Sequence, residues 1–598
     1  METAFHHAPI YRRNVEGTAV IVWLVLFLIG FLLILKDDLT REILLLWIIG
    51  GILTGCRLMP RAFSQYRLHQ RLRRSTLRRL SLEDLTLKLA HPPEDLFLGD
   101  GFEWQPQHAQ WTHELLAQGG PKGSRDSAWA HQLSERHEDL FQPLKETQGH
   151  TLILGTTGSG KTRTFDLLIS QAILRGEAVI IIDPKGDRDL RATAERTLKA
   201  LGKSRDFILF HPAFPKDSVR MDPLRNFSRP SELSSRIAAT IPSTNPSDPF
   251  KAFSQRALDQ IIQGLLFLEE RPTLITLRRI LEGGPESLVQ RALEHHLKTV
   301  LGSGWKSRLS QAARSRPGHN VSALAGLYRD HVASEHPSLP LEGLLSLWEH
   351  DRNHFGKMVA SLLPVMTMLT SGPLEGLLSP DASPIEDPRP ITDLGRIIAR
   401  QQVAYIGLDA LSDGPVATMI GLLLLSDLTA VAGERYNQGI PPTPVNIFID
   451  EAAEIINDPA IQLLNKGRGA GIRMTIATQT IADFTARLGS EAKTLQVLGN
   501  VNNLLALRVQ DAETQRYVTQ NLPTFRRKTI LRTLGNATLG PEPHLFTGNL
   551  GERLIEEDAD LVPSALLGQL ADLHYLGKLA GGRVIKGRIP LLVDGMDP

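Results

Sequence analysis

Eight consecutive residues carry the clearest chemistry in this sequence. Residues 155–162 read Gly-Thr-Thr-Gly-Ser-Gly-Lys-Thr and directly follow the apolar run 151–154. This is the G-x-x-x-x-G-K-[ST] pattern, whose glycines let successive backbone N–H groups point at phosphate oxygens. Lys161 would reach the β- and γ-phosphates, and the hydroxyl of Thr162 would hold Mg²⁺. A chance match is the alternative, but the strand, loop and helix that the motif requires all occur in order.

The same pattern predicts which residues bind the nucleotide. They are consecutive in the chain: Gly155, Thr156, Thr157, Gly158, Ser159, Gly160, Lys161, Thr162 and Arg163. The helix expected over 163–175 would add the positive end of its dipole. ATP is favoured over GTP, because the string nearest to a guanine-binding Asn-Lys-x-Asp, at 465–468, has arginine where the acid is required.

Two acids follow another apolar run. Residues 445–449 are typical of a buried strand, and the chain then continues into Asp450 and Glu451. At the carboxyl end of that strand Asp450 would hold Mg²⁺, and Glu451 would polarise the attacking water, a role that a hydrolase needs and a nucleotide binder does not. Many buried strands end in an acid, so the pair gains its meaning from the phosphate loop.

A further strand offers two more candidates. Residues 473–477 precede Thr478 and Gln479, and a strand beside that of Asp450 would point Gln479 at the γ-phosphate. Arg468, on the loop before this strand, could act as an arginine finger for a neighbouring subunit, with Arg508 as a second candidate. The alternative is that Arg468 and Arg473 are surface arginines and that Gln479 only caps a strand.

These residues need a scaffold that brings distant segments together. Apolar runs alternate with helical patterns, at 151–154, 178–182, 403–408, 445–449, 473–477 and 504–509. Such continuous runs predict a parallel sheet that is covered on both faces. From about residue 231 to 384 strand signals vanish and helical patterns such as 250–270 and 355–369 dominate. The sequence therefore predicts an α/β fold with an all-helical insertion.

Two apolar stretches near the N-terminus, 18–35 and 43–59, are long enough to cross a bilayer. A signal peptide, or a buried pair of core helices, is the alternative. Two arginines precede the first stretch, the short loop between the stretches is net negative, and eight arginines without an acid occupy 57–80. By the positive-inside rule we expect a multi-pass protein with both termini in the cytoplasm.

Composition sets bounds on other functions. The chain of 598 residues has 22% charged residues and a net charge of +1, which is ordinary for a folded protein and gives no bulk attraction for nucleic acid. Its one cysteine, Cys56, excludes an intrachain disulfide and a cysteine-based zinc site. Any grip on DNA must therefore come from local basic patches.

With these parts in hand, the chain resembles the type IV coupling proteins of bacterial conjugation, the TraD/TraG class, and most of all the TraD proteins of integrating conjugative elements. The resemblance covers nearly the full length. It rests on the N-terminal hairpin, Gly149-His150 before the loop, the helical insertion and the strings IIIDPKGD, IFIDEAAEI and RGAGIRMTIATQT. Several of these motifs are also shared with the wider FtsK/HerA translocases.

The resemblance implies a RecA-like P-loop ATPase with an all-α domain and a two-helix transmembrane hairpin in the bacterial inner membrane. It also implies a homohexamer that uses ATP and Mg²⁺ to move DNA, expected to be single-stranded with relaxase attached, from relaxosome proteins to a type IV secretion channel. The positions that match family motifs are Lys161 and Thr162 (Walker A), Asp450 and Glu451 (Walker B), Arg468 (arginine finger) and Gln479 (sensor).

The expected domains follow from these assignments. Residues 1–60 form the membrane hairpin, 61–148 a basic segment and connector, 149–230 and 385–598 the nucleotide-binding domain, and 231–384 the all-α domain. Some relatives carry a long acidic C-terminal tail that docks the relaxosome. This chain has only Asp594 and Asp597 at its end, which leaves its docking surface open.

Two basic clusters are candidates for DNA contact, with solvated surface charge as the alternative. They are Lys306, Arg308, Arg314 and Arg316 in the helical insertion, and Arg526, Arg527, Lys528 and Arg532 near the end. Two other functions compete with the conjugative pump. One is a chromosome-segregation translocase, which usually has more membrane spans and a winged-helix reader, and the other is a receptor whose nucleotide site gates the docking of secreted proteins.

Overall fold

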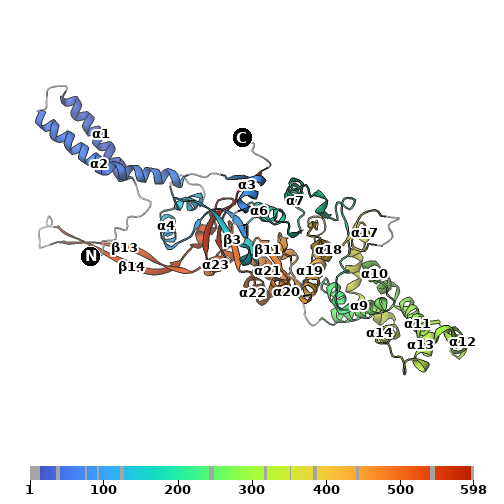
Figure 1. Ribbon diagram of the computed structural model, residues 1–598. Coiled ribbons are helices and arrows are strands. Elements are labelled where there is room, and N and C mark those ends of the chain that lie inside the picture. Colours follow the sequence, from blue (N-terminus) through green and yellow to red (C-terminus); the bar gives the residue numbers. More distant parts are fainter. Residues whose placement is uncertain are drawn as a thin grey trace. The chain divides into compact units, whose positions relative to one another are not determined.

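The computed structural model describes residues 14–34, 41–73, 77–90, 93–121, 127–241, 248–315, 320–350, 352–380, 387–438, 443–538 and 546–593. Figure 1 shows the course of the chain. Its residues divide into two compact units. Unit 1 comprises Met1–Pro143, Ile153–Thr164 and Asn503–Pro598, and unit 2 comprises Leu144–Leu152 and Phe165–Asn502. The finer domain division expected from the sequence stays a prediction.

The sheet of unit 2 is parallel, as the apolar runs predict. Its strands, in spatial order, are β11 (Ile472–Thr478), β10 (Val445–Ile449), β5 (Ala178–Asp183), β9 (Val403–Gly407) and β6 (Phe207–Phe210). Every residue of β5, β9 and β10 is buried, which explains why these strands are apolar without alternation. The short strand β4 (Thr151–Leu154) contributes two residues to each unit.

Helices cover this sheet. They are α5 (Leu144–Thr147), α6 (Lys161–Leu174), α7 (Arg188–Ala200), α18 (Leu394–Ala399), α19 (Gly414–Asn437), α20 (Asp458–Lys466), α21 (Ile481–Leu488) and α22 (Glu491–Gly499). The helix α19 contains an apolar stretch long enough to cross a membrane, but 72% of its apolar 18-residue window is buried inside the protein. It is therefore a core helix, because a helix without a polar face needs protein on all sides.

Between these parts the described residues from 230 to 378 contain helices and no strand. The helices are α8 (Pro230–Ala238), α9 (Pro249–Phe267), α10 (Leu274–Gly283), α11 (Glu286–Leu301), α12 (Trp305–Ser315), α13 (Asn320–His331), α14 (Leu339–Glu349), α15 (Arg352–Val359), α16 (Leu362–Leu369) and α17 (Leu374–Leu378). The helical pattern at 355–369 splits at Ala360 and Ser361. Pro364 accounts for the split, since its ring clashes with the carbonyl four residues earlier.

Unit 1 holds an antiparallel sheet that the sequence did not reveal. Its spatial order is β3 (Glu138–Pro143), β2 (Asp95–Glu103), β16 (Val584–Arg588), β15 (His574–Lys578) and β12 (Asn503–Ala506). Strands from the expected connector thus pair with strands from the end of the chain. Around this sheet lie β1 (Arg79–Ser81), α3 (Leu82–Ala90), α4 (Pro106–Ala117), α23 (Ala512–Gln520), α24 (Ser564–Leu567) and β17 (Leu591–Val593).

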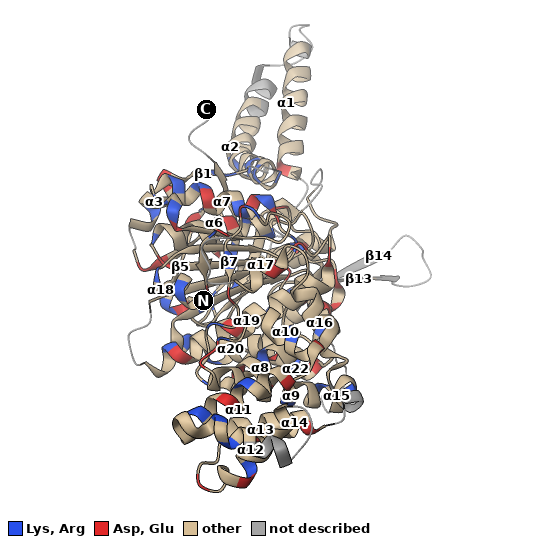
Figure 2. Cartoon of the chain, turned by 90° about the vertical axis from the view of Figure 1, so that its right-hand side faces the viewer, with Lys and Arg blue, Asp and Glu red and all other residues tan. Residues whose placement is uncertain are grey.

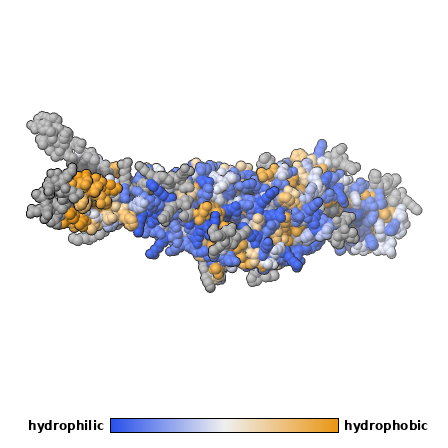
Figure 3. Space-filling model, turned by 90° about the horizontal axis from the view of Figure 1, so that it is seen from above, coloured by the Kyte–Doolittle hydropathy of each residue, from blue (hydrophilic) through white to orange (hydrophobic). Residues whose placement is uncertain are grey.

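Two N-terminal helices lie side by side in unit 1. The first, α1 (Val15–Ile34), is apolar, long enough to span a bilayer and almost wholly exposed, and Figure 3 shows apolar side chains gathered at these helices. The second, α2 (Arg41–Leu72), includes the stretch 43–59 but continues past Pro60 to Leu72. Among the described residues only α1 and α19 have the length and apolarity of a span, so the second crossing stays a prediction.

Gly587 in β16 offers a test of the antiparallel sheet. A Cβ at this position would overlap the ring of Tyr575, which is buried and donates a hydrogen bond to the carbonyl of Leu98 at 2.9 Å. We expect Gly587→Ala to cost about 1–3 kcal/mol of stability and to lower the temperature of thermal unfolding. Gly499→Ala is the matched control, because an added Cβ there meets nothing within 4 Å. Equal behaviour of the two variants would contradict this packing.

Candidate nucleotide site

The backbone of the phosphate loop in unit 1 depends on its glycines. Gly158 and Gly160 have φ angles of 77° and 113°, in the region that L side chains rarely adopt. A Cβ on Gly155 would lie 2.5 Å from the hydroxyl of Ser159, and one on Gly160 would lie 2.9 Å from the side chain of Leu573. The loop thus forms a cradle that side chains would fill, which fits a phosphate held by backbone N–H groups.

Segments next to the strands β12 and β15 of unit 1 fix this loop. The N–H of Thr156 donates to the carbonyl of Arg508 at 2.9 Å, and the carbonyl of Ser159 accepts from the N–H of Leu573 at 3.0 Å. The guanidinium of Arg508 contacts Asp572 at 2.8 Å. Arg508, the second candidate for an arginine finger, therefore has an ion-pair partner within its own unit.

Lys161 lies at the first position of α6 and is 93% buried, with 7% of its surface exposed. Its ammonium donates to the carbonyl of Gly155 at 2.8 Å, which folds the side chain back over the loop. Thr162 and Arg163 follow in the first turn and are half-buried. The helix end and the ammonium therefore converge on the loop, as the sequence motif requires.

Unit 2 holds the acid pair. Asp450 follows β10 directly, and its N–H donates to the carbonyl of Ile182 at the end of β5 at 3.2 Å. Its side chain accepts from the N–H of Glu451 at 3.0 Å. Glu451 has φ 43° and ψ 48°, a left-handed conformation that costs a non-glycine residue free energy. Strain of this kind persists where the surrounding structure demands it, which is common at functional sites.

Gln479 lies beside Glu451, because β11 pairs with β10. Its side-chain amide donates to the carboxylate of Glu451 at 3.1 Å. The residue sits between the end of β11 and the start of α21, where Thr480 and Asp483 form a reciprocal capping box. The strand β11 fixes the backbone before Gln479 and the cap fixes the backbone after it, so the side-chain amide is held toward Glu451.

Sequence reasoning missed Asp183, the last residue of β5, which lies at the edge of the sheet where Asp450 follows β10. Its carboxylate accepts from the N–H groups of Lys185, Gly186 and Asp187, at 3.0, 3.0 and 2.5 Å, and from the hydroxyl of Tyr405 at 2.8 Å. Burial raises the pKa of this carboxyl in spite of these hydrogen bonds. The signal was available, because an acid at the end of an apolar run is the same pattern that singled out Asp450.

Arg468 is exposed on the 3₁₀ turn Gly467–Ala470, before β11. The guanidinium of Arg435 donates to the carbonyl of Ala470 at 3.1 Å, and a Cβ on Gly469 would lie 2.8 Å from the ring of Tyr436. The end of α19 therefore holds the turn in place. Arg473, in contrast, forms an ion pair with the buried Glu177 at 2.9 Å and serves the structure.

The basic clusters differ in their surroundings. Lys306 and Arg308 are exposed on α12, the side chain of Arg314 is not described, and Arg316 lies outside the described residues. Arg527 lies 3.3 Å from Glu557, and Lys528 lies 3.5 Å from Glu556 on the paired strand. Arg526 also approaches Glu556, at 3.9 Å. Basic and acidic residues are interspersed on most helices (Figure 2), and the second cluster is balanced locally.

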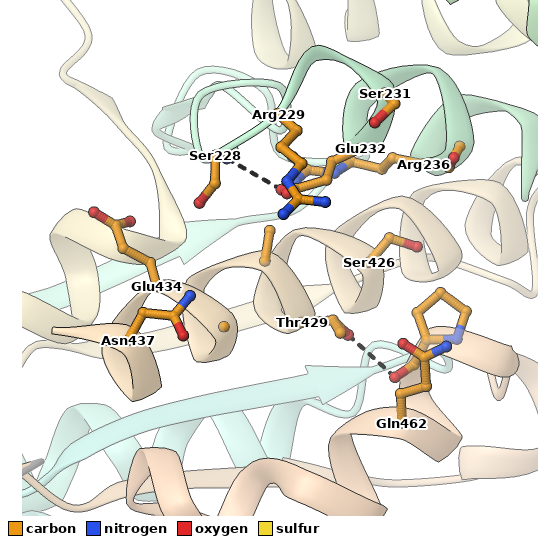
Figure 4. A pocket seen from close by; sticks show the side chains of 14 residues that line it. Ser228, Arg229, Ser231, Glu232, Arg236, Ser426, Thr429, Glu434, Asn437 and Gln462 are labelled. Carbon is orange, nitrogen blue, oxygen red and sulfur yellow. Dashed lines mark hydrogen bonds between the residues drawn. The ribbon is translucent and has the colours of Figure 1, made fainter. Parts of the chain in front are cut away.

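A polar pocket of about 550 Å³ lies elsewhere in unit 2, between α8, α19 and α20 (Figure 4). Its lining includes two arginines and two glutamates, Arg229, Arg236, Glu232 and Glu434. Arg236 is buried and bonded to the buried Asp427 at 2.7 Å. With no glycine cradle and no excess of positive charge, this pocket lacks the features that hold a triphosphate.

A cluster of buried ionisable groups supports the antiparallel sheet of unit 1. Asp100 accepts from the guanidinium of Arg588 at 2.7 Å and from the imidazole of His131 at 3.3 Å. Burial raises the pKa of Asp100, but these hydrogen bonds outweigh it and hold the pKa below its usual range. Although Asp100, His131 and His137 are close enough to ligate a metal, the arginine already occupies the carboxylate, so we assign the cluster to structure.

Lys586 of the same cluster predicts a pH dependence. Burial lowers its pKa from 10.5 to about 7, so below pH 7 the folded chain carries a disfavoured charge. Between pH 7 and 10.5 the unfolded chain binds more protons, and stability rises with pH. Lys586→Met should therefore raise the unfolding temperature most at pH 6 and least at pH 9.5. The half-buried Lys578→Met serves as control, and an equal gain at both pH values would contradict this assignment.

Two family models match parts of this chain. Residues 139–332 match the family model of the type IV secretion-system coupling protein DNA-binding domain. Residues 444–556 match the model described as the TraM recognition site of TraD and TraG. The first match includes the phosphate loop, and the second includes the acid pair, Gln479 and Arg468.

Individual relatives are more distant. A stretch of 74 residues, 12% of this chain, is 35% identical to the type 4 coupling protein DotL of Legionella pneumophila subsp. pneumophila and spans only 10% of DotL. The unbound monoclinic form of the bacterial conjugative coupling protein TrwBdeltaN70 has a TM-score of 0.51 and 15% identity, over 87% of this chain and 95% of that one. The plasmid coupling protein TrwB in complex with ADP and Mg²⁺ has a TM-score of 0.47 and 16% identity, over 76% and 89%.

The two family domains lie in the order that the sequence motifs imply, and each contains one half of the expected ATPase residues. The fold is that of TrwB, an α/β P-loop protein with a helical region. The chain belongs to the type IV coupling protein family of conjugation and type IV secretion.

Proposed function

We propose that this coupling protein is a membrane-anchored ATPase that drives DNA from a relaxosome into a type IV secretion channel. The observation that carries the proposal is the constrained pair of Glu451 and Gln479 beside Asp450, in a chain that also has a complete phosphate loop. A protein that only binds nucleotide has no need for a strained carboxylate with an amide held against it.

In this proposal the loop binds the phosphates of ATP. The N–H groups of 155–163 surround the phosphate oxygens, and the ammonium of Lys161 moves from the carbonyl of Gly155 to the β- and γ-phosphates. The hydroxyl of Thr162 and the carboxylate of Asp450 would hold Mg²⁺. When bound, Mg²⁺ would neutralise the charge that develops on the phosphates.

Glu451 orients and polarises the water that attacks the γ-phosphate, and Gln479 holds the carboxylate and responds to its change of charge. Arg468 acts in a neighbouring subunit of a homohexamer. Its support is its exposure on a turn that α19 holds in place, since a side chain that serves another copy must reach outward from a fixed base.

DNA and membrane contacts complete the proposal. On α12, Lys306 and Arg308 are exposed and Lys306 lies over the ring of Trp305 at 5.9 Å, an arrangement suited to a nucleic-acid backbone. The apolar helix α1 supports anchorage in the inner membrane, and the arginines of 57–79 support a cytoplasmic position for the residues beyond them.

Glu451→Gln tests the catalytic role of the acid. The amide keeps the size of the side chain but cannot take a proton, so we expect ATP turnover to fall at least about 100-fold while ATP binding stays. Turnover and nucleotide affinity of the purified full chain in detergent measure both. Lys161→Ala should lose turnover and affinity together. Turnover unchanged in Glu451→Gln would refute the assignment.

Arg468→Ala tests action between subunits. We expect turnover to fall by a factor of about 10² or more, with the unfolding temperature unchanged because Arg468 is exposed. Mixing Arg468→Ala copies with Asp450→Asn copies should restore part of the activity, since each supplies what the other lacks. Arg473→Ala is the control, and it should lower the unfolding temperature instead. No restoration at any mixing ratio would show that the arginine does not act in trans.

DNA separates the pump from its alternatives. Single-stranded DNA should stimulate ATP turnover of the full chain at low salt, with the effect declining as salt rises. A lack of stimulation at every salt concentration would favour a nucleotide-gated receptor for secreted proteins. Loss of chromosome segregation, without loss of conjugative transfer, in a deletion strain would favour a segregation translocase.

A further inference from the structure

The strands β13 (Thr524–Thr538) and β14 (Phe546–Asp560) form a separate two-stranded sheet in unit 1. Each strand is 15 residues long, and Figure 1 shows them as a ribbon with no other strand alongside. Isolated two-stranded sheets are marginal in water, and a long open edge is a template for pairing with another strand. We therefore expect another strand to pair with an open edge of this ribbon.

The base of the ribbon is secured by α4 of the same unit. The side chain of Gln110 in α4 accepts from the N–H of Lys528 at 2.9 Å and donates to its carbonyl at 2.8 Å. Lys528 therefore turns its backbone groups to the outer edge of β13. Because such groups alternate along a strand, those of Ile530 face the same edge, and among the described residues no backbone hydrogen bond reaches them across it.

Charge divides cleanly between the two strands. The described part of β13 carries Arg526, Arg527, Lys528 and Arg532 with no acid, a sum of +4. On β14 five acids and one arginine, Glu552, Glu556, Glu557, Asp558, Asp560 and Arg553, sum to −4. The ribbon thus presents a basic edge and an acidic edge.

The pairing register reinforces this pattern. Arg526 lies opposite Asp558, Lys528 opposite Glu556, Ile530 opposite Leu554 and Arg532 opposite Glu552. Leu531 and Leu554 remain about half exposed, at 51% and 53%. A second ribbon in the same orientation would continue the sheet and set a basic strand against the acidic edge.

We propose that β14 of one copy of this chain pairs edge to edge with β13 of the next copy. The contact is head-to-tail, because its two edges differ, and such contacts close into a ring when the rotation between copies closes. The inference adds to the homohexamer of the proposed function by naming a surface that joins its subunits. Six ribbons joined in this way alternate in charge and close a sheet without a free edge.

A charge exchange tests the pairing between copies while keeping the pairs within each ribbon. The variant combines Arg526→Glu, Lys528→Glu and Arg532→Glu with Glu552→Arg, Glu556→Lys and Asp558→Arg. Copies of this variant should pair with one another as wild-type copies do. In a mixture with the wild type, each contact between a variant ribbon and a wild-type ribbon would place acidic residues beside acidic residues or basic residues beside basic residues.

The measurement is co-purification of two differently tagged full-length copies from membranes. We expect two tagged copies of the exchanged variant to co-purify as well as two wild-type copies do. The amount of wild type that co-purifies with the variant should be less than about a tenth of that. The control exchanges an exposed ion pair elsewhere, Arg329→Glu with Glu349→Arg, and should mix freely. Free mixing of the ribbon variant with the wild type, or no association between wild-type copies, would overturn the inference.

A second measurement guards against misfolding of the variant. Thr529→Cys and Ile555→Cys, each alone in a Cys56→Ser background, are placed in different copies and joined with a short bismaleimide. The mixed pair should cross-link, and Thr529→Cys copies alone should not. Equal cross-linking of both would show that like edges meet, and would overturn the inference.

ATP turnover of the wild type reports separately on the proposed function. If the exchanged chain mixes freely but loses its DNA stimulation, the basic strand binds DNA instead.

Discussion

Ile449 of β10 pairs with Ile182 of β5 on one side and with Ile476 of β11 on the other. Because all three strands are parallel, they end at the same level, and the residues that follow them meet at one edge of the sheet. Asp183, Asp450 and Gln479 come from segments far apart in the chain, yet this pairing alone brings them together. The chemistry of unit 2 therefore depends on strand register, since a shift by one residue would turn each acid to the opposite face.

The sequence was informative where a local pattern carries the constraint. The phosphate loop, the acid after β10 and the strand that ends at Thr478 all lie where short motifs and buried runs predict them. The sequence alone does not distinguish the helix α19 from a membrane span, because a buried core helix can be as long and as apolar as a span. Only the protein around α19 in the structure distinguishes the two. Asp183 was within reach of the same reasoning that found Asp450.

Long-range antiparallel pairing left no such local signal. The segment that holds β2 and β3 was expected as a connector, since nothing in the sequence near Gly101 indicates that Gly587 and Arg588 lie beside β2. The partners of the basic residues on β13 were hidden for the same reason, because Glu556 and Glu557 become neighbours only once the register of the ribbon is set. Counting the basic residues of β13 in the sequence therefore overestimates the positive charge that the ribbon carries without an acidic neighbour.

The pairing of β2 with β16 also orders events during synthesis. Asp100 and Arg588, which share an ion pair in this sheet, are 488 residues apart. At about 5–20 residues per second, roughly 25–100 s pass between the two on the ribosome. The apolar N-terminal helix α1 emerges from the ribosome long before β16 is synthesised. The membrane can therefore capture the nascent chain while β2 still lacks its partner strand β16. Chaperones that cover exposed strands would act in that interval, and a chain cut short before residue 584 would leave this sheet open.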